Sequence, residues 1–159
     1  MASATDTIRH YLATLAYRLQ TAVRGAPAGF GGFEAGHGVR TPHEIVHHMN
    51  DALTSAHRHV SGTAHTDPQS DLAFDDEISR FHELLARVDG ALVEHSPEED
   101  ILRKVFQGPL SDAMTHVGQI AMLRRMAGSS VRGQNFMAAN VKIGRVGDKQ
   151  SGPRKPSGK

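Results

Sequence analysis

Apolar side chains recur every three or four residues along most of the chain, with polar residues between them. This spacing places the apolar residues on one face of a helix, so it predicts helices rather than strands. The pattern predicts four long helices at about 6–23, 41–61, 73–95 and 108–128, with a short turn of helix over 98–106. Four helices joined in this way are typical of an all-α four-helix bundle.

The start of the second helix carries a clear capping signal. Thr41 is expected as the N-cap, with Pro42 at the first helical position and Glu44 completing a capping box. Gly62 is expected to end this helix. Gly128 has the same role in the last helix, as a C′ glycine.

The segment between the first two helices lacks the helical pattern. Residues 24–40 read RGAPAGFGGFEAGHGVR and are dense in glycine, which disfavours helix and strand alike. A long Gly-rich loop is therefore expected here, with Phe30 and Phe33 attaching it to the bundle. Loops of this length inside compact domains are often functional.

The pattern ends again near the C-terminus. Residues 1–131 are expected to form the bundle as one domain, and 132–159 an irregular C-terminal extension. The final stretch GDKQSGPRKPSGK is basic and rich in Gly, Pro and Ser, which predicts mobility and disorder in its last part.

Composition narrows the chemistry that the chain can carry. The 159 residues include no cysteine, so a metal would need nitrogen and oxygen ligands. The net charge of +1 does not favour specific binding to nucleic acid or to an acidic membrane. No apolar run approaches membrane-spanning length and the N-terminus lacks a secretion signal, which predicts a cytoplasmic protein. The one excess is histidine, with 11 residues.

The sequence HEIVH at residues 43–47 has the spacing of a zinc protease motif. On a helical wheel, however, Ile45 and Met49 define the core face, and His47 lies nearly opposite its centre. His43 is close behind His47, so both are expected to point largely to solvent, while Glu44 is engaged in the capping box. A zinc protease also needs a further downstream ligand and a strand-rich substrate edge, and the pattern predicts neither. The motif is therefore not interpreted as a protease site.

A different set of residues is suited to a metal. His48 lies on the shoulder of the core face, and Asp112 and His116 project from consecutive turns of the last helix, beside its apolar strip. A carboxylate and an imidazole from one helix, with an imidazole from a facing helix, commonly form metal sites in bundles. Such a set suits divalent Zn, Ni, Fe or Mn and leaves a position for water or substrate. The alternative is structural: a boundary His48 bonded to a neighbour, and an Asp112–His116 hydrogen bond within the helix.

The two motifs that carry these residues also resemble a known family. TPHEIVHHMND, at 41–51, and HVGQIAMLRRMAG, at 116–128, resemble the DinB-like superfamily of bacterial four-helix metalloproteins. That family typically has T-x-x-E-[LI]-x-x-H-x-x-D on its second helix and H-x-x-x-H, continuing R-G-Q, on a late helix. The matching residues of this chain are Thr41, Glu44, Ile45, His48, Asp51, His116, Gly118 and Gln119.

Two positions depart from the family pattern. Asp112 stands where the first histidine of the late pair is usual, and Val117 replaces the usual arginine. A carboxylate ligand adds negative charge and harder oxygen character, so it affects which metal is preferred more than whether one binds. The loss of the arginine bears on substrate recognition or on a surface salt bridge.

The resemblance implies a metal-bearing bundle, often dimeric, some of whose members are S-transferases or isomerases that use thiols such as bacillithiol or mycothiol. It implies one divalent transition metal at His48, Asp112 and His116, with Zn or Ni ahead of Fe or Mn. It further implies a low-molecular-weight thiol, a small-molecule substrate and a homodimer. An open metal position would bind and deprotonate the thiol. The alternative is a non-catalytic bundle whose polar triad is structural or a relic, and no catalytic side chain is predicted.

Overall fold

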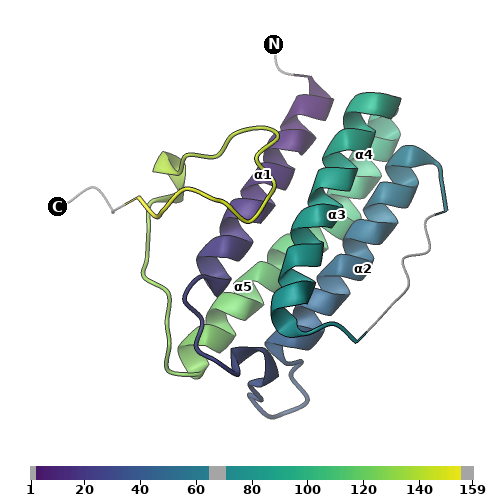
Figure 1. Ribbon diagram of the computed structural model, residues 1–159. Coiled ribbons are helices and arrows are strands. Elements are labelled where there is room, and N and C mark those ends of the chain that lie inside the picture. Colours follow the sequence, from purple (N-terminus) through teal and green to yellow (C-terminus); the bar gives the residue numbers. More distant parts are fainter. Residues whose placement is uncertain (1–2, 65–70, 155–159) are drawn as a thin grey trace.

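Long helices lying side by side form the body of the molecule (Figure 1). The computed structural model describes residues 3–64 and 71–154. Over these ranges the regular structure is helical and contains no strand, so the all-α expectation is confirmed. The elements are α1 (Ala4–Val23), η1 (Phe30–Gly32), α2 (Pro42–Ser61), α3 (Phe74–His95), α4 (Glu99–Val105), η2 (Phe106–Leu110), α5 (Ser111–Met126) and η3 (Phe136–Ala138).

The capping predictions for α2 are confirmed. The Glu44 amide donates to the Thr41 hydroxyl, and the Thr41 amide donates to the Glu44 carboxylate at 2.7 Å, which completes the capping box. Gly62 follows the helix with φ of 69°, a left-handed conformation that glycine adopts without steric cost. α1 has a capping box of the same kind, formed by Ser3 as the N-cap and Asp6. The helix therefore begins at Ala4, slightly earlier than its apolar pattern predicts.

The last two helices are joined by a π-helical turn, where the sequence predicts a fresh start. Residues 106–110 continue α4 into α5 as η2, with Pro109 inside the turn. Proline lacks the N–H that an α-helix would use, and the wider π turn accommodates this loss. The Ser111 hydroxyl donates to the Phe106 carbonyl at 2.6 Å across the turn. η2 ends at Leu110, and α5, which carries Asp112 in its first turn, begins directly after it at Ser111.

α2 packs against α3 along one flank and against α5 along the other. The predicted neighbourhood of the second and last long helices is therefore confirmed. Val46 and Asn50, which lie off the predicted core face of α2, are fully buried because α3 covers that flank. The core includes fully buried side chains from four helices: Leu12, Leu15, Leu19, Ile45, Met49, Leu53, Phe81, Leu85, Val88, Ala113 and Ile120.

The connection between α1 and α2 folds against the end of the bundle. Phe30 is buried and meets Phe74 edge-on at 6.0 Å, and Phe33 packs at the margin of the core, as the sequence predicts. A Cβ atom on Gly31 would lie only 2.6 Å from the Phe74 ring, so this position requires glycine. Arg124 of α5 donates to backbone carbonyls of the same connection and holds it in place.

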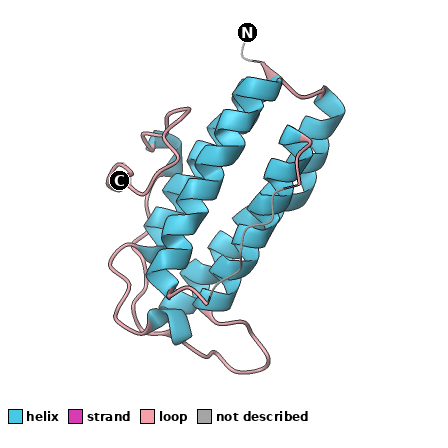
Figure 2. Ribbon diagram, turned by 45° about the vertical axis from the view of Figure 1, so that its right-hand side comes forward, coloured by secondary structure: helices cyan, strands magenta, loops and turns pink. Residues whose placement is uncertain are grey.

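Residues 129–154 run back along the bundle and pack mainly against α1 and α3 (Figures 1 and 2). The Tyr17 hydroxyl donates to Gln134 at 2.6 Å, and the Arg18 guanidinium lies 3.4 Å from the Phe136 ring centroid. Val146 is buried in the core cluster. The stretch predicted to be mobile, 147–159, follows Val146. Gln150 and Ser151 in this stretch accept hydrogen bonds from Arg24 and Arg145. Residues 155–159 lie outside the described residues.

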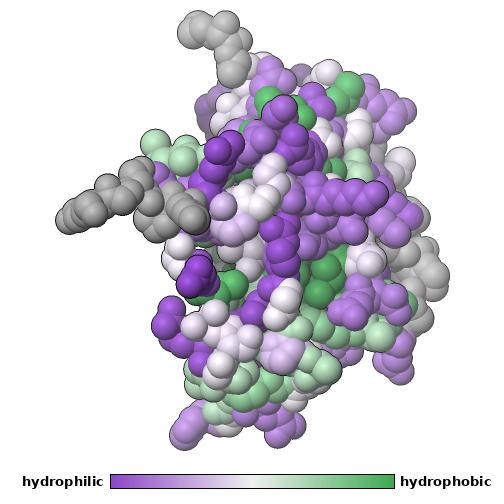
Figure 3. Space-filling view, turned by 60° about the vertical axis from the view of Figure 1, so that its left-hand side comes forward, coloured by the Kyte–Doolittle hydropathy of each residue, from purple (hydrophilic) through white to green (hydrophobic). Residues whose placement is uncertain are grey.

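Figure 3 shows the face that lies on the left-hand side of Figure 1. This face is mostly hydrophilic, and apolar side chains gather at its lower end, where α5 ends and the α1–α2 connection lies. Among the helices that the structure describes, none is long and apolar enough to cross a membrane.

Candidate metal centre

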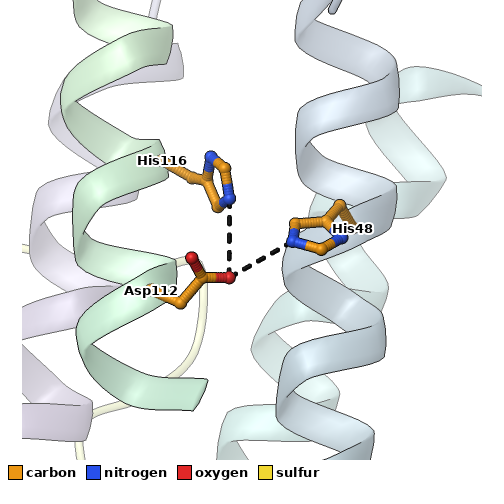
Figure 4. Close-up of side chains that lie close together, drawn as sticks. All are labelled: His48, Asp112 and His116. Carbon is orange, nitrogen blue, oxygen red and sulfur yellow. Dashed lines mark hydrogen bonds and ion pairs between the residues drawn. The ribbon is translucent and has the colours of Figure 1, made fainter. Parts of the chain in front are cut away.

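The three residues predicted as metal ligands converge in the structure. His48 projects from α2, and Asp112 and His116 project from successive turns of α5 toward it (Figure 4). The Asp112 Oδ2 atom lies 3.2 Å from His48 Nε2 and 3.5 Å from His116 Nε2. The two imidazole rings meet edge-on, with centroids 4.9 Å apart.

These separations fit a single small cation. Two ligand atoms, each about 2.1 Å from a tetrahedral metal, lie roughly 3.4 Å from one another. Both Asp112–histidine distances already match that value. All three candidate ligand atoms lie within 4.8 Å of one another, so the remaining pair needs to close by at most about 1.4 Å. Within residues 3–64 and 71–154, no other group of histidines and carboxylates is gathered in this way.

The site is open on one side. The side chain of His116 is 10 % exposed, whereas those of His48 and Asp112 are 40 % and 46 % exposed. His116 thus forms the floor of the site, against the core residues Ala113 and Ile120 of its own helix. A cation held here would retain access to solvent, which leaves room for water or a substrate.

Gln119 fixes the orientation of the His116 ring. Its Oε1 atom lies 2.7 Å from His116 Nδ1, and an amide oxygen can only accept, so Nδ1–H is the donor. In the neutral ring, the lone pair of Nε2 therefore faces the Asp112 carboxylate. Two lone pairs at 3.5 Å repel each other, and either a metal ion or a proton between them removes that repulsion. Hydrogen bonding of a metal-bound histidine through its second nitrogen is the usual arrangement in metal sites.

The expected solvent orientation of the HExxH histidines is wrong. His47 Nδ1 lies 2.8 Å from Glu77 Oε1, and His43 Nε2 lies 2.8 Å from the Leu72 carbonyl oxygen. Both rings are half-buried beside α3, because α3 covers the flank of α2 that faces away from α5. Glu44 is held in the capping box as predicted, and hydrogen bonds from Thr41 lower its pKa. The protease interpretation gains no support, since His43 and His47 are each bonded separately.

The sequence reasoning missed a buried polar pair between α2 and α3. Asn50 is fully buried, and its amide nitrogen donates to the Glu77 carboxylate at 2.6 Å and to the Glu77 carbonyl at 3.0 Å. With His47 on its other carboxylate oxygen, buried Glu77 has polar partners on both sides. The sequence signal that could have indicated this pair is the position of Asn50 four residues after Val46, which places both side chains on the same face of the helix. We interpret this group as part of the helix packing.

His82, one of the remaining histidines, holds the C-terminal segment. Its Nδ1 atom donates to the Val146 carbonyl at 2.7 Å, and its Nε2 atom lies 2.9 Å from the Gln20 amide nitrogen. The ring is therefore neutral, with Nε2 accepting. Burial lowers the pKa of His82, and the bond to Val146 opposes this shift only in part.

No protein-family model matches this chain, and neither a curated protein nor a solved structure matches it. The fold and the site together define an all-helical bundle with a candidate His/Asp/His metal centre. Membership of the DinB-like superfamily stays a prediction from the residue patterns.

Proposed function

We propose that the protein is a four-helix metalloprotein of DinB-like type that binds one divalent transition metal through His48, Asp112 and His116. The supporting observation is the convergence of these three side chains from two helices, with ligand atoms within 4.8 Å of one another. A second supporting feature is Gln119, which orients the deepest of the three ligands. Two nitrogen ligands and one oxygen ligand suit Zn or Ni first, and Fe or Mn next.

The proposed activity is transfer or isomerisation of a small molecule, with a low-molecular-weight thiol as co-substrate, in the cytoplasm and as a homodimer. The reaction, the thiol and the homodimer come from the family resemblance, and the cytoplasmic location comes from the absence of a spanning run and of a secretion signal in the sequence. When bound, a divalent ion supplies Lewis acidity at an open position, which favours the deprotonated form of a thiol. The protein's own contribution is to hold His116 in one tautomer through Gln119 and to keep the site open beside His48 and Asp112.

The second candidate function is a non-catalytic bundle in which the triad is structural or a relic. The contact between Asp112 and His48 favours it, because an N–H at His48 Nε2 can donate to the Asp112 carboxylate without a metal. Exposed ion pairs of this kind stabilise a protein by only about 0–1 kcal/mol. If the triad is structural, replacing one of its residues should therefore change the stability of the protein little. If it is a metal site, the same replacement should strongly weaken metal binding.

Elemental analysis of tag-free protein separates the two functions. The metalloprotein should retain about one equivalent of transition metal per chain after dialysis, since three side-chain ligands chelate one ion. His48→Ala should lose most of it. His47→Ala should retain it, because His47 bonds to Glu77 and not to the site. His59→Ala is the matched control, since His59 is exposed on the same helix and bonds to a backbone carbonyl. A stable, metal-free parent protein would support the non-catalytic bundle.

The thiol-dependent activity needs its own assay. Metal-loaded protein would be incubated with bacillithiol or mycothiol and a panel of electrophilic acceptors, and thiol consumption followed over time. Thiol consumption that depends on both the metal and His116 supports the proposed transferase. An isomerase would regenerate its thiol, so it would show as acceptor rearrangement that requires the thiol without consuming it. Metal binding with neither result in any combination would leave a metal-binding bundle and remove the thiol proposal.

A further inference from the structure

A groove of about 810 Å³ lies beside the candidate metal centre, and His116 is part of its lining. It lies between the N-terminal half of α2 and the C-terminal half of α5, with the end of the α1–α2 connection beside it. One end is polar and is formed by Thr115, His116 and Gln119 of α5. The rest is mainly apolar and includes Val39, Ile45, Met122 and Met126.

His116 is the one residue shared by the lining of the groove and the candidate metal centre, so the two features are neighbours. From Thr115 to Met126 the helix rises roughly 16 Å, at about 1.5 Å per residue, which sets the length of the groove. A ligand lying along it would therefore have one end beside His116 and an apolar body extending toward the end of α5.

Several apolar side chains that are not buried in the bundle core are clustered in the groove. Val39, Met122 and Met126 are 50 %, 62 % and 54 % exposed, and they account for three of the eight large apolar side chains that are exposed among the described residues. Clustered exposed apolar side chains mark binding surfaces, whereas scattered ones are ordinary. Methionine is suited to this role because its flexible side chain adapts to the shape of a ligand.

The charge of the lining favours a ligand with an uncharged body. Arg40 is the one lysine, arginine, aspartate or glutamate among the lining residues. It lies near Glu44 and contributes to lowering the pKa of that carboxyl group, so its positive charge already has a negative neighbour. Hydrogen-bonding groups are gathered at the other end, on Thr115, His116 and Gln119.

We propose that this groove binds a small apolar molecule, with its polar head at Thr115, His116 and Gln119 and its body along Met122 and Met126. Its volume falls within the range of roughly 300–1,000 Å³ that is typical of small-molecule sites. The inference deepens the proposed function and rests on it in one respect, namely that the polar head lies against His116, a proposed metal ligand. The binding of the apolar body does not require the metal.

Metal-free protein can therefore test the groove by itself, with the uncharged fluorophore 1-aminoanthracene as the probe. We expect saturable binding of one probe per chain. Met122→Gln and Val39→Ser should each weaken binding at least tenfold, because each removes apolar contact area from the ligand. Met137→Gln is the matched control, since Met137 is 97 % exposed and lies outside the groove. Its affinity should equal that of the parent.

His48→Ala separates this inference from the proposed function. It should lose metal and keep probe affinity, whereas Met122→Gln should keep metal and lose probe affinity. Absence of saturable binding, or equal affinity in Met122→Gln and the parent, would overturn the groove proposal and leave the metal proposal standing. A second copy of the chain is the competing occupant. If sedimentation shows a dimer that Met122→Gln converts to monomers, the groove is a subunit interface and the ligand assignment is overturned.

Discussion

Replacing Asp112 tests the residue at which this chain departs from its proposed family. Asp112→His keeps the spacing of four residues and supplies an imidazole of similar reach, so metal binding should remain within about tenfold of the parent. Asp112→Ala leaves two imidazoles on separate helices, which form a poor chelate. Losing a residue that is hydrogen-bonded to a metal ligand typically costs 10–100-fold in metal affinity, so loss of a ligand itself should exceed 100-fold.

The expected size of the effect follows from binding linkage. With free metal at 100 times the parent's Kd, binding stabilises the folded state by about 2.7 kcal/mol. If Asp112→Ala raises Kd 100-fold, the same concentration gives about 0.4 kcal/mol. For a chain of this size, 1 kcal/mol shifts Tm by about 2–4 °C. The metal should therefore raise the Tm of the parent by about 5–10 °C and that of Asp112→Ala by about 1 °C.

The assay is thermal unfolding of the parent and the two variants, with and without ZnCl2, together with a competitive zinc titration. Without metal, the three Tm values should lie close together, because Asp112 is half-exposed and exposed ion pairs contribute little. Asp100→Ala is the control for nonspecific carboxylate binding, since Asp100 is exposed and pairs only along its own helix with Lys104. Zinc affinity in Asp112→Ala equal to that of the parent would refute the assignment of Asp112 as a ligand.

Three further predictions concern residues around the site and the bundle. Gln119→Leu should weaken zinc binding by about 10–100-fold in a competitive titration, because the His116 ring loses its orienting acceptor; unchanged affinity would contradict this role. Arg124→Met should lower the free energy of unfolding by about 2–4 kcal/mol in urea, since buried Arg124 donates to the carbonyls of Ala22, Arg24 and Ser129, whereas exposed Arg125→Met should change it by no more than about 0.5 kcal/mol. For His82, whose pKa lies below the ordinary 6.5, the unfolded chain takes up a proton as the pH falls below 6.5 while the folded chain resists it, so stability present above that pH is lost below it. His82→Gln should make unfolding less pH-dependent between pH 8 and 5, and an equal pH dependence in both proteins would contradict the buried neutral ring.

The sequence predicted those features that depend on local spacing. The capping box of Thr41 and Glu44 fixed the start of α2, because it requires only residues three apart. The common direction of Asp112 and His116 follows from helical geometry. The position of His48 beside the core face, on the flank toward α5, required only the core face of its own helix.

The features that the sequence did not predict depend on neighbouring elements. A helical wheel measures distance from one core face, so it could not show that α3 also covers the flank of α2 carrying His43 and His47. The predicted break between the helices at 98–106 and 108–128 is bridged, because a π turn accommodates Pro109, which would break an α-helix. The packing of residues 129–154 rests on single contacts, such as the bond between His82 and Val146, which have no periodicity.

The measurement that tests the metal centre most directly is anomalous X-ray diffraction from crystals grown with ZnCl2, with data collected on both sides of the zinc absorption edge. We predict one zinc peak bounded by His48 Nε2, Asp112 Oδ2 and His116 Nε2, at about 2.0–2.2 Å from each atom. A map with no peak at these three atoms, or with the zinc held instead by His43, His47 and Glu77, would contradict the account.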